Sequence, residues 1–132
     1  MRGRWRNRNI KLIRNKLIGR FRTDPQYPEY NLSYPGHLKN LIDWLSRPVK
    51  PMDYETPTCI NGKRVALSGA GGRFATAKCR EKLTELLTFV KAEVLPGQVG
   101  IAVPGEAWTS DVLTLTDEQK AQLMAQAEDV IK

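Results

Sequence analysis

The sequence predicts an α/β protein built on a parallel β-sheet. From residue 37 onward, segments with a helical spacing of apolar residues alternate with short apolar segments that glycine and proline bound. Such alternation is typical of parallel sheets, in which helices connect one strand to the next. At 132 residues, the chain is long enough for one domain with a modest core.

Three helices are predicted in this part of the chain. Apolar residues three or four positions apart place the first at about 37–45 and the second at about 75–91. The third helix begins at Thr116 and runs to about residue 131. Thr116 and Gln119 have the spacing of a capping box, in which two side chains satisfy backbone amides at the start of a helix.

Three short strands are predicted at "KRVAL" (63–67), "AEVLP" (92–96) and "VGIAV" (99–103). The segment "SGAGGR", residues 68–73, follows the first strand directly and is predicted as a glycine-rich turn into the next helix. Residues 104–115 are predicted as a loop.

Basic side chains gather at the beginning of the chain. Residues 1–24 carry nine basic side chains against one acidic, whereas the remaining 108 residues carry 12 against 13. The formal net charge of +7 therefore belongs to an N-terminal arm. We expect residues 1–27 to form this arm, disordered at first and then helical from Ile10, and residues 28–132 to form the α/β part.

The composition argues against several kinds of site. Cys59 and Cys79 are too few for a disulfide framework and match no zinc pattern, so we expect reduced thiols in a cytoplasmic protein. His37 is the only histidine, which leaves no partner for a histidine-based metal site or a Cys–His pair. No catalytic side chain and no metal site is predicted. There is also no run of about 18 apolar residues that could span a membrane.

Two loops are candidates for ligand binding, because ligands of open α/β sheets bind beyond the carboxyl ends of the strands. The first loop is "PEYNLSYPG", residues 28–36. Its amides, Asn31 and Ser33 offer hydrogen bonds, and Tyr30 and Tyr34 offer flat apolar surface, which together suit a planar heteroaromatic ligand. The alternative is a connection rich in turns whose tyrosines cover the core.

The second candidate loop is "LSGAGGR", residues 67–73. Glycines after a strand let backbone amides approach a ligand closely, and the N-terminus of the next helix favours anions. The segment has neither the ending of a Walker loop nor the glycine spacing of the dinucleotide fingerprint. The alternative is a tight turn without a ligand.

The order of these segments resembles one protein family. "PEYNLSYPGHLKNLIDWLSRP", residues 28–48, is similar to the Pro-Glu-Tyr-Asn segment and following helix of the NADPH-dependent FMN reductases. "GKRVALSGAGGR", "CREKLTELLTFVKAEVLP" and "TLTDEQ" follow in the same order as in that family. The resemblance covers about residues 28–132 and implies a flavodoxin-like, doubly wound parallel sheet, of which these residues form the C-terminal part.

The resemblance also implies an activity. Members transfer hydride from NADPH or NADH to FMN and then reduce quinone-, azo- or metal-type acceptors, usually as homo-oligomers. The cofactors implied are FMN and NADPH. By resemblance, the residues expected to contact the isoalloxazine ring are Pro28, Glu29, Tyr30 and Asn31. Those expected at the flavin edge are Ser68, Gly69, Ala70, Gly71 and Gly72.

The sequence departs from the family before Pro28. The family begins with strands and a Gly-Ser-x-Arg-type loop that holds the FMN phosphate, and residues 1–27 resemble neither. We therefore expect the C-terminal portion of such a domain, joined to an unrelated basic leader. An alternative interpretation is a non-catalytic truncated homologue whose basic arm binds nucleic acid or an anionic surface. A third is a solvated leader without function.

Overall fold

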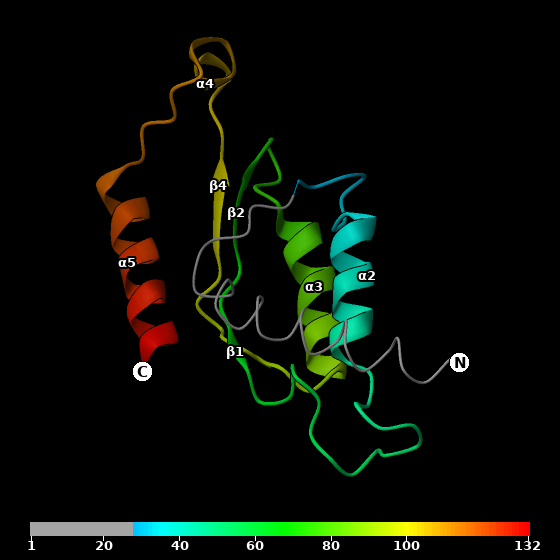
Figure 1. The fold of residues 1–132 in the computed structure, drawn as a ribbon. Helices are drawn as coiled ribbons and strands as arrows, with labels where there is room; N and C mark the ends of the chain where they lie inside the picture. Colours follow the sequence, from blue (N-terminus) through cyan, green and yellow to red (C-terminus); the bar gives the residue numbers. More distant parts are fainter. Residues whose placement is uncertain (1–27) are drawn as a thin grey trace.

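The computed structural model describes residues 28–132. The predicted arm at 1–27, with its helix and its nucleic-acid or surface binding, lies outside the described residues. Helices and strands alternate as expected (Figure 1). In chain order they are α2 (Gly36–Leu45), β1 (Arg64–Val65), β2 (Ser68–Gly71), α3 (Ala77–Phe89), β3 (Glu93–Val94), β4 (Val99–Ala102), α4 (Gly105–Ser110) and α5 (Asp117–Ile131).

The strands pair in parallel, which confirms the predicted class. β1 pairs with β3, and β2 pairs with β4. Two further hydrogen bonds join the segment that carries β1 and β2 to the segment that carries β3 and β4. The carbonyl of Val65 accepts from the amide of Leu95 at 2.9 Å, and that of Leu67 accepts from Val99 at 3.2 Å. The described strands thus form one narrow ribbon of two parallel segments.

Two local predictions were wrong. The segment predicted as a turn, 68–73, begins as strand β2, and its turn starts only at Gly72. Its backbone pairs with β4 over four residues, which satisfies the donors and acceptors that a free glycine turn would leave to solvent. The predicted loop at 104–115 contains the short helix α4, which follows Pro104 and stands beyond the end of β4 (Figure 1).

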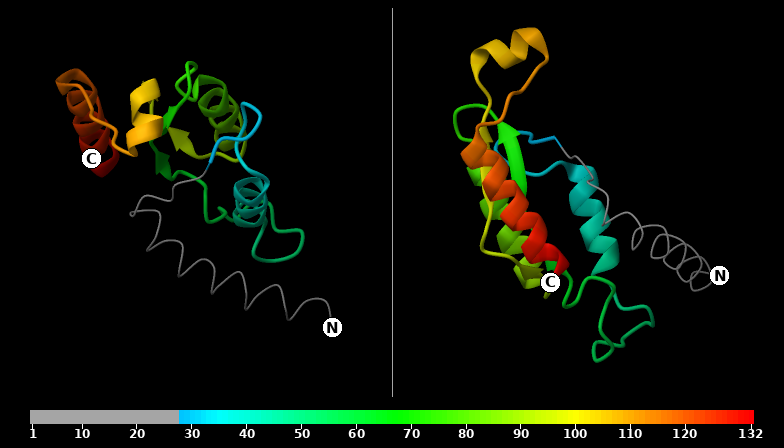
Figure 2. Two further views of the ribbon diagram at one scale, coloured as in Figure 1. Left: turned by 90° about the horizontal axis from the view of Figure 1, so that it is seen from above. Right: turned by 90° about the vertical axis from the view of Figure 1, so that its left-hand side faces the viewer.

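Helices lie on both sides of this ribbon. α2 and α3 lie side by side on one side, and α5 lies on the other (Figures 1 and 2). The core between α2, α3 and the strands consists of Leu38, Ile42, Ile60, Leu87 and Ala92. Burial of apolar side chains of this size, at about 1.5–3 kcal/mol each, is the main stabilisation of such a layer.

A buried glutamine attaches α5 to the strands. The Gln126 side-chain amide donates to the carbonyls of Leu67 and Gly97, each at 2.9 Å.

The predicted capping box at the start of α5 is confirmed. Thr116 Oγ1 accepts from the Gln119 amide at 3.1 Å, and Gln119 Oε1 accepts from the Thr116 amide at 3.0 Å. Within residues 28–132, no helix is long and apolar enough to cross a membrane.

Candidate functional site

The two loops singled out in the sequence lie at the same end of the molecule. There β2 ends, α2 and α3 begin, and residues 28–36 run across the top of the helix pair (Figure 1). Glu29 of the first loop acts electrostatically on Cys79 in the first turn of α3. The fold therefore brings the first loop next to the helix that follows the second.

Residues 30–33 form a tight turn in the first loop. The amide of Tyr30 donates to the carbonyl of Ser33, and the amide of Ser33 donates to the carbonyl of Tyr30, both at 3.0 Å. The two central residues, Asn31 and Leu32, have φ angles of 52° and 58°. Two successive positive φ angles are the mark of a type I′ turn, which asparagine tolerates well.

The two tyrosines of this loop have different surroundings. Tyr30 is 57% exposed, whereas Tyr34 is partly buried and packs against the core cluster. The alternative interpretation, in which the tyrosines of this loop cover the core, therefore holds for Tyr34. Tyr30 and the exposed Asn31 remain free to contact a ligand from solvent.

Glu29 carries an acceptor without a partner. Its Oε2 atom is buried, and no described residue donates a hydrogen bond to it. A buried polar atom without a partner costs about 1–3 kcal/mol, so a ligand that offered an N–H here would relieve this cost. Burial, followed by the charge of Glu29, raises the pKa of the Cys79 thiol above its ordinary value. Because burial disfavours the thiolate, the buried Cys79 is unsuited to act as a nucleophile.

The glycines of the second loop serve two purposes. A Cβ atom at Gly69 would lie 2.9 Å from Thr76 Cβ, and one at Gly71 would lie 3.0 Å from Thr76 Cγ2. These two glycines therefore make room for Thr76. A Cβ atom at Gly72 would have no neighbour within 4 Å, so the backbone there is open to a ligand. Ser68 and Ala70 alternate with the glycines along β2 and are exposed.

A strained turn follows Gly72. The amide of Ala75 donates to the carbonyl of Gly72 at 2.9 Å, and Ala75 and Thr76 have φ angles of 45° and 57°. A left-handed conformation costs about 1–3 kcal/mol for a residue other than glycine, and it is rare for a β-branched one. The sequence does not single out Thr76, because its conformation follows from contacts with β2 and α3. Arg80, which touches this turn, was likewise missed.

No side-chain cluster in the described range suggests chemistry of its own. Among residues 28–132, no three His, Cys, Asp or Glu side chains lie close enough to hold a metal ion. The described features are an exposed aromatic ring at Tyr30, an acceptor at Glu29 and an open backbone at Gly72. Such a set can hold a planar group with polar edges, which the resemblance identifies with a flavin ring.

Comparison with known proteins supports the resemblance. The family model described as NADPH-dependent FMN reductase matches residues 26–104, a span that includes both loops. An NAD(P)H-dependent FMN reductase of Pseudomonas aeruginosa is 45% identical over 69 residues, which cover 52% of this chain and 34% of that protein. A quinone reductase of Escherichia coli is 41% identical over 70 residues, 52% of this chain and 33% of that protein.

A solved structure extends the similarity to the fold. FerB from Paracoccus denitrificans, a flavoenzyme NAD(P)H:(acceptor) oxidoreductase, matches with a TM-score of 0.58 and 30% identity. The match covers 86% of this chain and 62% of FerB. It confirms the flavodoxin-like fold class. The chain matches about a third of the length of the curated relatives.

Proposed function

The chain belongs to the NADPH-dependent FMN reductase family, and we propose that it acts as an NAD(P)H-dependent FMN oxidoreductase. One observation carries the proposal. The two loops that the resemblance assigns to the flavin lie at the same end of the parallel strands, and both fall within the span that the family model matches. Quinone-, azo- or metal-type compounds are the acceptors that we propose.

Each residue of the first loop has a distinct role in this proposal. Tyr30 and Asn31, both exposed, would contact the flavin ring with an aromatic face and an amide. Glu29 Oε2 would accept a hydrogen bond from a ring N–H, which gives this buried atom the partner that the described residues do not offer. Pro28, at the start of the loop, would limit the conformations of the segment and so keep these groups in place.

The second loop would contribute backbone. Gly72 would let its amide approach the flavin edge, and the exposed Ser68 and Ala70 lie on the strand that leads to it. Gly69 and Gly71 would act indirectly, because they admit Thr76 beneath the loop. When bound, FMN supplies the hydride chemistry, and NADPH or NADH supplies the hydride. The protein residues bind and orient these groups.

The phosphate end of FMN is a separate matter. The Gly-Ser-x-Arg-type loop that the resemblance assigns to it has no counterpart among residues 28–132. The proposal therefore assigns the ring, rather than the phosphate, to the described residues. It follows that substitutions in the first loop should dominate the affinity for FMN.

A flavin titration tests the proposal. The full chain is titrated with FMN while the quenching of flavin fluorescence is followed. We expect saturable binding in the micromolar range, weakened about tenfold, or by about 1.4 kcal/mol, by Tyr30→Ala or Asn31→Ala. NAD(P)H oxidation with a quinone acceptor is then measured on the same proteins.

Tyr54→Ala is the matched control. Tyr54 is 74% exposed and belongs to the connection between α2 and β1. This connection extends at the opposite end of the molecule from the two loops (Figure 1). This variant should bind FMN like the unchanged chain. No quenching at about 100 μM FMN, which corresponds to binding weaker than about −5.5 kcal/mol, would exclude the proposal for this chain.

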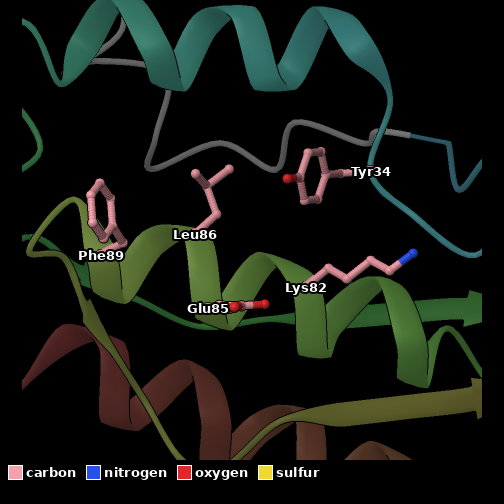
Figure 3. A pocket seen from close by; sticks show the side chains of 5 residues that line it. All are labelled: Tyr34, Lys82, Glu85, Leu86 and Phe89. Atoms are coloured by element: carbon pink, nitrogen blue, oxygen red, sulfur yellow. The ribbon is translucent and has the colours of Figure 1, made fainter.

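We propose a second copy of the chain as its protein partner. The exposed side chains Lys78, Lys82, Glu85 and Phe89 follow one another along one face of α3, at the spacing of successive helical turns. A pocket of about 290 Å³ opens on this face, and its lining includes Tyr34 and Leu86 (Figure 3). Phe89 is 84% exposed at its rim.

This face is complementary to itself. If two copies of α3 pack antiparallel about a two-fold axis, Lys82 of each copy meets Glu85 of the other, and Lys78 meets Phe89. Both contacts are favourable, as an ion pair and as a cation–π contact.

For the place of action we propose the cytoplasm, which the free thiols of Cys59 and Cys79 support.

A further inference from the structure

Arg80 of α3 contacts both residues of the strained turn. Its Nη2 donates to the carbonyl of Ala75 at 3.2 Å, and its Nε donates to Thr76 Oγ1 at 3.3 Å. Within the described part of the chain, no carboxylate lies within ion-pairing distance of this guanidinium. The Arg80 guanidinium therefore donates its hydrogen bonds to the two neutral acceptors of the turn and to a glutamine.

That glutamine connects the turn to the second strand segment. Arg80 Nη1 donates to Gln98 Oε1 at 3.4 Å, and Gln98 Nε2 donates to Thr84 Oγ1 at 2.7 Å. Gln98 directly precedes β4, and Thr84 lies one helical turn after Arg80. The guanidinium is thus held from the helix and from the strand, which fixes its orientation over the turn.

Gly100 in β4 makes this arrangement sterically feasible. A Cβ atom at Gly100 would lie 2.6 Å from the Ala75 carbonyl oxygen and would collide with the Arg80 guanidinium. On the other strand, Gly69 and Gly71 leave the corresponding room for the Thr76 side chain. The turn is therefore packed closely against both strands, and Arg80 supplies its polar contacts.

We propose that Arg80 is a positioning residue, which holds the left-handed turn at Ala75–Thr76 and thereby fixes the loop Gly72–Phe74 at the flavin edge. The assignment of the loop to flavin rests on the proposed function above. The claim that Arg80 holds the turn rests only on its hydrogen bonds to Ala75 and Thr76. A loop fixed before the ligand arrives loses less conformational freedom on binding, so its affinity is higher.

The test compares three variants of the full chain. Arg80→Gln removes the cation and the fork of donors, and Arg80→Lys retains the charge but offers no planar fork. Lys120→Gln is the matched control, since it removes one positive charge from an exposed position of another helix, α5. Without FMN, hydrogen exchange is measured at the amides of Ala75 and Ala77, which donate to the carbonyls of Gly72 and Phe74.

We expect exchange at these two amides to be about ten times faster in Arg80→Gln, intermediate in Arg80→Lys and unchanged in Lys120→Gln. The amide of Leu87, in the buried part of α3, serves as the internal reference for global unfolding. An equal acceleration at Leu87 would mean that Arg80 only supports the fold, and it would overturn the inference. Unchanged exchange at Ala75 and Ala77 in Arg80→Gln would overturn it as well.

FMN titration of the same variants separates this inference from the proposed function. A weakening of about tenfold in Arg80→Gln, with partial recovery in Arg80→Lys, supports positioning of a flavin-binding loop. Local acceleration of exchange with unchanged FMN affinity would overturn the positioning role. If the unchanged chain binds no FMN, the proposed function fails, while the exchange data still decide whether Arg80 holds the turn.

Discussion

Thr76 decides how closely the start of α3 approaches β2. Its side chain fills the space that the absent Cβ atoms of Gly69 and Gly71 leave. The sequence suggested that these glycines bring the backbone near a ligand, whereas the structure assigns two of them to packing. Of the three glycines in this loop, Gly72 has open space beside it, so it is the best test of ligand approach.

Gly69→Ala should destabilise the protein by about 1–3 kcal/mol, because the added methyl group overlaps Thr76 and the turn cannot retreat without losing its contacts. Unfolding by urea measures the change. Gly72→Ala is the matched control and should change the free energy of unfolding by less than about 0.5 kcal/mol. Thr76→Ala should recover part of the loss caused by Gly69→Ala. Equal effects of the two glycine substitutions would contradict this account.

Among the helices, α5 has the clearest local signal, yet little of it is buried. It contacts β4, and its only buried residue is Gln126. Few apolar contacts stabilise it, so its capping box carries a large share of the stability of its first turn.

Thr116→Ala should therefore cost about 0.5–2 kcal/mol and unfold the start of α5 first. The expected readout is faster hydrogen exchange in the first turn of α5, with little change in α3. Thr116→Ser keeps an oxygen that can accept from the Gln119 amide, so this variant should behave like the unchanged chain. A loss of stability in Thr116→Ser as large as that in Thr116→Ala would argue against the cap as the cause.

For the whole molecule, the prediction concerns assembly. If α3 pairs with a second copy as proposed, Lys82→Glu alone or Glu85→Lys alone places like charges opposite each other and should weaken the dimer about tenfold. The double variant Lys82→Glu/Glu85→Lys restores opposite charges across the two-fold axis and should dimerise like the unchanged chain. Size-exclusion chromatography with light scattering over a range of concentrations measures this, without any flavin.

Lys120→Glu changes the charge by the same amount at an exposed position on α5 and serves as the control. A monomer at every concentration would refute the proposed partner. A dimer that none of the charge substitutions affects would place the interface elsewhere.

Much of the architecture could be predicted because it depends on local patterns. The spacing of apolar residues located α2 and α3 to within about two residues, and the pair Thr116 and Gln119 located the start of α5. The alternation of these helices with short strands was sufficient for the parallel class. The motif from Pro28 onward identified the family.

The tertiary structure decided what local pattern leaves open. Residues 68–71 read as a glycine turn, and only pairing with β4, about 30 positions later, makes them a strand. The exposure of Tyr30, the partial burial of Tyr34 and the unpartnered Glu29 oxygen depend on how the first loop lies against α3. Arg80 carries no motif, because its role comes from acceptors and glycines that meet only in the fold. Local spacing sets helices and caps through neighbouring residues, whereas strand partners, burial and strained turns depend on contacts between distant parts of the chain.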